Sequence, residues 1–468
     1  MENNCDLTIE ALAPLIRRKK LSPIELTRFL LERISRLQPG INAYLTITAD
    51  AAIAQATQAE KEISRGHCRG VLHGIPISLK DLIYTRGIRT TAGSKILKRF
   101  VPKENAAIVN RLLECGCVFL GKTNLHEFAF GATNVNPHYG PVRNPWDTGR
   151  ISGGSSGGSA ASVVSAQALA SFGTDTGGSI RIPSAACGCV GLKPTYGRVP
   201  MSGILPLAAS LDHAGPLSRC VMDAAYLLNA VAEPRLWNTD PLRASAEIRN
   251  GVKSFRIGIP RQFFFDHIRT DVRQAVLASI GILEQLGAKI TELNLAGMEE
   301  TAALASEITG DEAFAHHEKW LKQRPQDYGK DVRLRLEQSS KTTAAVYIGA
   351  RQKLLAYSER FASALNKVDV LLTPTLPVTA PGIGQNEIRI GNVTENVRTA
   401  LLRLTRPGNL SGLPAISVPC GFSSDGLPIG LQLIGRRFEE TTLLRAAYAY
   451  EQATPWHFAF PSDARELP

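Results

Sequence analysis

The sequence predicts an α/β protein with a helical segment at its N-terminus, on three observations. Apolar residues in roughly the first 65 positions recur at helical spacing. From residue 71 onward, short apolar runs alternate with helical stretches and glycine-rich turns. The 468 residues are 44% hydrophobic and 20% charged, which is typical of a globular chain. This length is enough for one large α/β domain or for two ordinary ones.

Residues 1–65 are expected to form helices that pack against the rest of the chain. Residues 22–25 read Ser-Pro-Ile-Glu, a capping box with proline at the first helical position. The apolar residues that follow lie on one helical face: Leu26, Phe29, Leu30, Ile34 and Leu37. A second, alanine-rich helix is expected from about residue 48 to residue 64.

The sheet is expected to begin in residues 71–220 and to continue in residues 221–468. The first part has strand-like runs at 75–79 and 118–120, separated by a helical stretch at 105–114. In the second part, residues 298–365 are mostly helical in pattern. Further strands are expected at 255–259, 368–372, 415–418 and 429–433.

Charge, hydropathy and cysteine content argue against several functional classes. The net charge is +11, but the basic residues are scattered and no stripe interleaved with aromatic residues is visible, so direct nucleic-acid binding is not expected. No apolar run has transmembrane length, and residues 1–6 are followed by no signal-type apolar core. Eight cysteines are too few for a disulfide scaffold. We therefore expect a cytoplasmic protein with free thiols and no membrane partner.

The most unusual stretch is residues 151–194, which contains 9 glycines and 9 serines among its 44 positions. Two separate glycine-serine elements lie within it, at 153–158 and at 173–181. A flexible linker would not need two ordered elements, so this stretch is the candidate active site.

Two familiar motifs in this region lack the structural context that they require. Residues 116–123 match the nucleotide-binding P-loop pattern, but a helix precedes them and the positions between the glycines are strand-like. Residues 153–158 match the nucleophile elbow of α/β-hydrolases, but the preceding residues 144–150 are turn-rich and no downstream histidine stands out as a base. Neither interpretation is favoured.

A lysine offers the base that a serine nucleophile needs. A serine hydroxyl is a weak nucleophile unless a neighbouring group accepts its proton. Lys80 follows the apolar residues 75–79, and burial at such a position would favour its neutral form. Without further context, Lys80 beside Asp81 would more often be a solvated loop pair.

The pattern of motifs resembles the amidase signature family of serine amide hydrolases. The resemblance covers nearly the whole chain, through residues 74–81, 121–124, 144–146, 153–158, 173–183, 191–195, 372–375, 412–415 and 426–430. It implies a single α/β/α domain over residues 1–468, with a mixed, twisted central sheet. It also implies cleavage of a carboxamide C–N bond without metal or cofactor.

The resemblance assigns roles to individual residues. It implies Ser179 as nucleophile, Lys80 as base and Ser155 as the bridging serine, with a cis peptide bond between Gly154 and Ser155. The oxyanion hole is expected from the backbone of Thr176, Gly177 and Gly178. Supporting roles fall to Ser156, Asp175 and Arg181. The substrate pocket is expected to include Phe128, Phe130, Ala132 and Thr133, which suggests an apolar or aromatic acyl group.

Histidine chemistry is the rival mechanism. Three groups attract attention: His126 with Glu127, Asp212 with His213, and residues 316–318. None has the spacing of a helical zinc-binding motif, so no metal site is expected. A non-catalytic protein of the same fold is disfavoured because Lys80, Ser155 and Ser179 are all present.

The family contains enzymes of different specificity, and two alternatives remain. We favour a self-sufficient amidase for a small-molecule amide, with carbamate or ester cleavage also open and a homodimer as one arrangement. The alternative is the glutaminase subunit of a tRNA-dependent amidotransferase, which would bring partner subunits and nucleic acid. That subunit usually has glutamine where this chain has Ile182, and Ser-Arg-Tyr-Gly where residues 200–203 read Pro-Met-Ser-Gly. Its arginine for the glutamine carboxylate falls near residues 333–335, where Leu334 is one candidate for the position.

Overall fold

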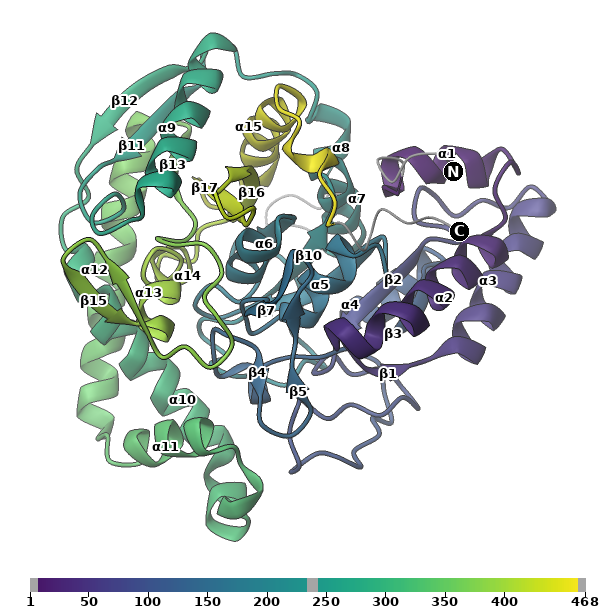
Figure 1. The fold of residues 1–468 in the computed structure, drawn as a ribbon, viewed down its shortest axis with the longest axis horizontal. Coiled ribbons are helices and arrows are strands. Elements are labelled where there is room, and N and C mark those ends of the chain that lie inside the picture. Colours follow the sequence, from purple (N-terminus) through teal and green to yellow (C-terminus); the bar gives the residue numbers. More distant parts are fainter. Residues whose placement is uncertain (1–6, 234–242, 462–468) are drawn as a thin grey trace.

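The computed structural model describes residues 7–233 and 243–461. The polar N-terminal residues 1–6, on which the expected cytoplasmic location partly rests, lie outside the described residues. Helices and strands alternate along most of the described chain (Figure 1).

Strands from almost the whole chain form one mixed sheet. In the described part it has eleven strands, in the order β1-β3-β2-β8-β10-β9-β16-β17-β13-β11-β12. The pairings of β2 with β3 and β8, and of β11 with β12 and β13, are parallel, and the other neighbours are antiparallel. The strands of the sheet are β1 (Tyr44–Ile47), β2 (Pro76–Lys80), β3 (Val118–Thr123), β8 (Ala170–Asp175), β9 (Val190–Lys193), β10 (His213–Ser218), β11 (Arg256–Pro260), β12 (Lys289–Leu293), β13 (Val370–Pro374), β16 (Ala415–Phe422) and β17 (Pro428–Gly435). The predicted mixed α/β fold is confirmed.

Among the described residues, three two-stranded sheets lie outside the main sheet. They pair β4 (Val135–Asn136) with β5 (Gly140–Pro141), β6 (Arg143–Asn144) with β7 (Asp147–Ile151), and β14 (Glu387–Ile390) with β15 (Val393–Asn396).

Helices cover both faces of the sheet. Those packed on or beside it are α1 (Ile9–Arg17), α2 (Pro23–Ile41), α3 (Ala49–Ser64), α4 (Ala107–Glu114), α5 (Gly157–Val164), α6 (Arg181–Cys187), α7 (Val221–Val231), α8 (Ala244–Glu247), α9 (Thr270–Gln285) and α15 (Glu440–Gln452). Successive residues of a strand point to opposite faces. On β9, Gly191 points to the face covered by α6, where it lies against Ser184. Val190 and Leu192 point to the opposite face and belong to the same hydrophobic core as the apolar residues of α7. The sheet is therefore sandwiched between α6 and α7.

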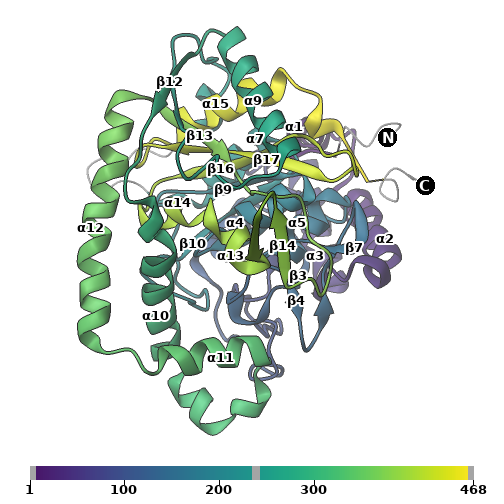
Figure 2. The same ribbon diagram turned by 60° about the vertical axis from the view of Figure 1, so that its left-hand side comes forward.

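A further group of helices stands at the end of the molecule away from α1–α3 (Figures 1 and 2). It comprises α10 (Thr301–Gln323), α11 (Lys330–Ser339), α12 (Ala344–Lys367), α13 (Val397–Arg403) and α14 (Arg406–Leu410). Helix α10 packs against α11, α12, α13 and α14. Short 3-10 helices complete the structure: η2 (Glu127–Ala129), η3 (Met298–Glu300), η4 (Pro325–Asp327) and η5 (Trp456–Phe458).

Local sequence signals explain where several elements begin. The Ser22 hydroxyl accepts hydrogen bonds from the N–H groups of Ile24 and Glu25 at the start of α2, so the predicted N-cap is confirmed. The P-loop-like residues 116–123 run into strand β3, which includes Gly121 and Lys122. The backbone N–H groups of a strand are hydrogen-bonded to its neighbours in the sheet and cannot surround a phosphate. This segment therefore does not form a phosphate-binding loop.

Candidate active site

The sheet brings the two glycine-serine elements to Lys80. Strands β2 and β8 are parallel neighbours, so their carboxyl ends meet at one edge of the sheet. Lys80 is the last residue of β2, and β8 ends at Asp175, directly before the loop that carries Ser179. Ser155 lies in the segment between β7 and α5. Three stretches far apart in the sequence thus converge at this edge.

Lys80 is buried and bound by three hydroxyl groups. Its Nζ lies 2.8 Å from Ser155 Oγ, 2.8 Å from Ser156 Oγ and 2.9 Å from Thr174 Oγ1. Burial lowers the pKa of Lys80 to about 7, although Asp175 and Asp212 favour its charged form. A neutral amine has a lone pair that can accept a hydroxyl proton, so Lys80 is placed and tuned to act as a base.

The loops that carry Ser155 and Ser179 are tied together through their backbones. The Gly154–Ser155 peptide bond is cis, as the resemblance implies. The Ser156 N–H donates to the carbonyl oxygen of Ser179 at 3.2 Å. Ser179 is 5% exposed and lines a cavity, and its hydroxyl forms no hydrogen bond with any residue in the described ranges. It is therefore available to a substrate.

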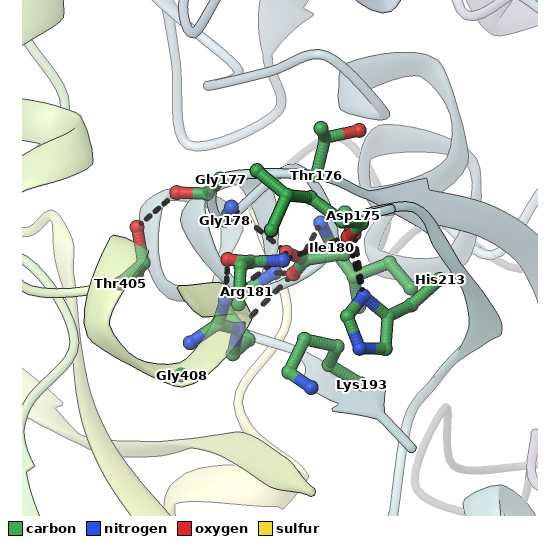
Figure 3. A network of polar contacts seen from close by, with 12 residues as sticks. Asp175, Thr176, Gly177, Gly178, Ile180, Arg181, Lys193, His213, Thr405 and Gly408 are labelled. Carbon is green, nitrogen blue, oxygen red and sulfur yellow. Dashed lines mark hydrogen bonds and ion pairs between the residues drawn. The ribbon is translucent and has the colours of Figure 1, made fainter. Parts of the chain in front are cut away.

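Asp175 shapes the loop that leads to Ser179 (Figure 3). Its carboxylate accepts hydrogen bonds from the N–H groups of Gly178 at 2.8 Å and Ile180 at 3.1 Å. Gly178 has φ +132°, and a Cβ there would lie 2.1 Å from Thr405 Oγ1, so only glycine fits. In the described structure, the N–H groups of Gly177 and Ser179 donate to no other residue.

This geometry revises the expected oxyanion hole. Gly178 cannot point its N–H at a substrate while Asp175 accepts that hydrogen, so its predicted donor role is not supported in this conformation. Gly177 and Thr176 both line the cavity beside Ser179. The N–H groups of Gly177 and Ser179, which donate to no other described residue, remain available to a substrate oxygen.

A buried ion pair holds Asp175 in place. Arg181 Nε and Nη2 each lie 3.0 Å from one oxygen of the Asp175 carboxylate. Arg181 is anchored in turn by Gln432 and Asn409. Burial disfavours the charged carboxylate, but the Arg181 guanidinium outweighs this and holds the pKa of Asp175 well below its usual range. These contacts are consistent with the supporting roles expected for both residues.

The cavity in front of Ser179 has a volume of about 310 Å³, which suits a small molecule. Its lining comes from the nucleophile loop, residues 129–131, and helices α10, α11, α13 and α14. The lining residues are Ala129, Phe130, Gly131, Thr176, Gly177, Ser179, Leu207, Ala305, Ser306, Glu307, Thr309, Gly310, Asp311, Arg335, Gln338, Ser339, Thr342, Arg398, Leu402 and Arg406.

Of the four pocket residues expected from the sequence, only Phe130 lines this cavity. Phe128 turns away and packs on the ring of His317 at 4.4 Å between centroids, because residues 128 and 129 both have positive φ. Ala132 is buried in a side cluster with Ile182, and Thr133 lies outside the lining as well.

Among the described residues, the cavity also contains three arginines, of which Arg335 lies in the segment 333–335 considered from the sequence and Arg398 and Arg406 were not expected. Arg335 of α11 lines it and donates to the carbonyl oxygen of Phe130 at 2.6 Å and to Asp331 at 2.6 Å. Leu334 is 43% exposed and is not part of the lining. Of residues 333–335, Arg335 is thus the one that reaches the site. Arg398 and Arg406 line it from α13 and α14.

The histidines do not assemble a competing centre. His126 Nε2 contacts Asp331 at 2.9 Å, and His317 Nδ1 contacts the Tyr328 hydroxyl at 2.9 Å. Within residues 7–233 and 243–461, no group of three or more His, Cys, Asp or Glu residues is arranged to hold a metal ion. Ser156, one of the serines in the elbow-like residues 153–158, donates to the carbonyl oxygen of Thr174 and lies beside Lys80 rather than a histidine.

Comparison with known proteins identifies the family. The amidase family model matches residues 25–444. The chain belongs to the amidase signature family.

Similar proteins of this family include amidotransferase subunits and amidases. The chain is 41% identical to a glutamyl-tRNA(Gln) amidotransferase subunit from Geobacter sp. (strain M21), over 97% of this chain and 98% of that protein. It is 33% identical to a chain of a vestigial protein complex that reveals the evolutionary origins of an s-triazine catabolic enzyme, with a TM-score of 0.91 over 95% of this chain and 98% of that one. A solved amidase is 36% identical, with a TM-score of 0.88 over 95% and 99% of the two chains.

Among the helices that the structure describes, none is both long enough and apolar enough to cross a membrane.

Proposed function

We propose that this chain is a serine amide hydrolase that releases ammonia or an amine from a small carboxamide through an acyl-enzyme on Ser179. One observation carries the proposal: a buried lysine with a pKa of about 7 is hydrogen-bonded to Ser155, and the loop of Ser155 is tied by a backbone hydrogen bond to Ser179, which lines the cavity. A serine, a base and a small-molecule cavity are the parts that acyl transfer needs.

The first half of the proposed reaction forms the acyl-enzyme. Ser179 Oγ attacks the carbonyl carbon while its proton passes to Ser155, whose own proton passes to neutral Lys80. The negative charge that develops on the carbonyl oxygen is met by the N–H groups of Gly177 and Ser179. The proton then returns from Lys80 through Ser155 to the leaving nitrogen, and the C–N bond breaks.

The second half regenerates the enzyme with the same groups. A water molecule gives its proton to neutral Lys80 and attacks the ester carbonyl. As the tetrahedral intermediate collapses, the C–O bond to Ser179 breaks and Ser179 takes the proton back. The products are a carboxylic acid and free enzyme, so no external oxidant or reductant is required.

The relatives favour glutamine as the carboxamide. The full-length relatives at about 40% identity are named as subunits of glutamyl-tRNA(Gln) amidotransferase, which supports the amidotransferase alternative over the self-sufficient amidase preferred from the sequence. In that case the chain works with partner subunits and contributes the glutaminase step.

Ammonia release by the purified chain separates the two candidates. The substrates are glutamine, short aliphatic amides, aryl amides and carbamates, assayed with and without the other subunits of an amidotransferase. Turnover that requires those subunits and uses glutamine identifies an amidotransferase component, and turnover of a simple amide by the chain alone identifies a self-sufficient amidase. The Ser179→Ala variant should lose at least ~1000-fold in rate with any substrate. Retention of activity in that variant would refute the Ser179 mechanism.

A further inference from the structure

Two arginines stand next to the nucleophile loop without the counter-charges that buried arginines usually have. Arg398 lies in the first turn of α13, and Arg406 is the first residue of α14. The stem of Arg406 packs on the loop itself, since a Cβ added to Gly177 would lie 3.6 Å from Arg406 Cγ. Both side chains line the cavity that Ser179 opens into.

Neither guanidinium group is neutralised by the protein. Arg406 is 6% exposed, and its side chain makes no hydrogen bond or ion pair with any residue in the described ranges. The Nε of Arg398 is buried without a hydrogen-bond partner, and the guanidinium lies over the Phe130 ring, 6.0 Å from the centroid. Arg335 differs, because Asp331 lies 2.6 Å from it.

The acidic residues of the cavity form no ion pair that would compensate the positive charge of Arg398 and Arg406. Glu307 and Asp311 line it from α10, but in the described structure neither lies within ion-pair distance of an arginine of the cavity. Burial raises the pKa of Asp311.

Two unpaired positive charges at one place are energetically costly. Burial, together with Arg335 and Arg406, lowers the pKa of Arg398 to about 9, although the Asp331 carboxylate, which forms no ion pair with Arg398, partly opposes this shift. Burial lowers the pKa of Arg406 to about 10. Guanidinium groups nevertheless remain protonated in proteins at neutral pH. The cost of holding them there is recovered when an anion binds between them.

We propose that Arg398 and Arg406 form the subsite for a carboxylate on the acyl part of the substrate. The inference rests on the proposed function and narrows its substrate class to short carboxamides that also carry a carboxylate, such as monoamides of small dicarboxylic acids. Glutamine is one member of this class. Its carboxylate would bind to Arg398 and Arg406, since Arg335 is already paired with Asp331 and with the Phe130 carbonyl.

The position of Arg406 explains why the substrate must be short. Its stem touches Gly177, two residues from Ser179, so the carboxylate lies only a few bonds from the reacting carbonyl. A planar carboxylate matches the two parallel N–H groups that a guanidinium presents. A neutral aromatic acyl group would leave both charges unpaired.

Matched pairs of amides test the subsite. Succinamate and glutaramate carry a carboxylate where succinamide and glutaramide carry a neutral carboxamide of the same shape. Of succinamate and glutaramate, we take the one with the higher kcat/KM and compare it with its own diamide. Because the diamide has two equivalent amide groups, its kcat/KM is halved first. We expect the value for the anion to be at least tenfold higher. Arg406→Gln and Arg398→Gln should each lower kcat/KM for the anion by about 10- to 100-fold, the range for a charged hydrogen bond. The selectivity for the anion, taken as the ratio of its kcat/KM to that of the neutral amide, should fall by at least tenfold in both variants. Arg389→Gln, an exposed change of the same charge, is the control and should affect neither.

A second readout does not depend on turnover. A fluorophosphonate probe labels an active serine nucleophile, and a bound product slows the labelling. Succinate or glutarate should protect Ser179 far better than butyrate, and the protection should be lost in Arg406→Gln and Arg398→Gln. Equal protection by butyrate, or protection unchanged in both variants, would overturn the subsite while leaving the serine mechanism intact. Absence of both labelling and turnover in the wild type would instead overturn the proposed function itself.

Discussion

The protonation state of Lys80 should set the lower pH limit of the activity. The amine must be neutral to accept a proton, and burial lowers its pKa to about 7. The neutral fraction is then about one half at pH 7, about one tenth at pH 6 and about one hundredth at pH 5. A lysine with the ordinary pKa of 10.5 would be neutral in only ~0.03% of molecules at pH 7. Burial thus raises the neutral fraction of Lys80 at pH 7 roughly a thousandfold.

The assay is kcat/KM, or the rate of fluorophosphonate labelling, measured from pH 5 to pH 9. We expect the rate to rise tenfold per pH unit up to about pH 7 and then to level off. Lys80→Met should lower the rate by at least ~100-fold and remove this dependence. The reasoning fails if the rate continues to rise tenfold per unit to pH 9, or if the profile of the wild type persists in Lys80→Met.

Three further substitutions test the loop around the nucleophile. Gly178→Ala forces φ +132° on a residue with a Cβ that would meet Thr405 Oγ1 at 2.1 Å, so kcat should fall by ~100-fold or more with KM less affected, and wild-type kinetics would contradict this. Arg181→Met leaves the Asp175 carboxylate buried without its partner and should lower the free energy of unfolding in urea by about 3–5 kcal/mol. A loss below about 1 kcal/mol would show that the remaining donors to Asp175, the N–H groups of Gly178 and Ile180 and the Asn409 amide, stabilise its charge without Arg181. Ser156→Ala removes one of the three hydroxyl groups around Lys80 but not the proton path, so kcat should fall by only ~10-fold; a ~1000-fold loss would make Ser156 part of the relay.

The proposed triad could be expected from the sequence because its members lie in short, ordered motifs. Lys80 ends an apolar run that becomes β2, and the glycines around Ser155 mark turns whose geometry depends on local sequence. The structure adds the reason why they meet, which is the parallel pairing of β2 with β8. That pairing joins segments about 90 residues apart and leaves no trace in either motif.

The pocket could not be predicted in the same way. Positive φ at Phe128 and Ala129 breaks the alternation of side chains, so Phe130 faces the cavity and Phe128 does not. Arg398 and Arg406 come from α13 and α14, more than 200 residues after the nucleophile, and reach it only through the packing of these helices. An isolated arginine in a helix is most often a solvated residue, so the sequence carries no signal for either position.

The buried ion pair behind the loop also affects the base. Asp175 is one of the two carboxylates that favour the charged form of Lys80, and Arg181 offsets the negative charge of Asp175 with two hydrogen bonds of 3.0 Å. Without Arg181, the field of Asp175 at Lys80 would be stronger, and the pKa of the lysine would rise above about 7. In Arg181→Met the acidic limb of kcat/KM should therefore move to higher pH, whereas Arg181→Lys, which keeps the positive charge, should leave it near the wild-type position. An unchanged limb in both variants would mean that Arg181 supports the loop mechanically and has no influence on the base.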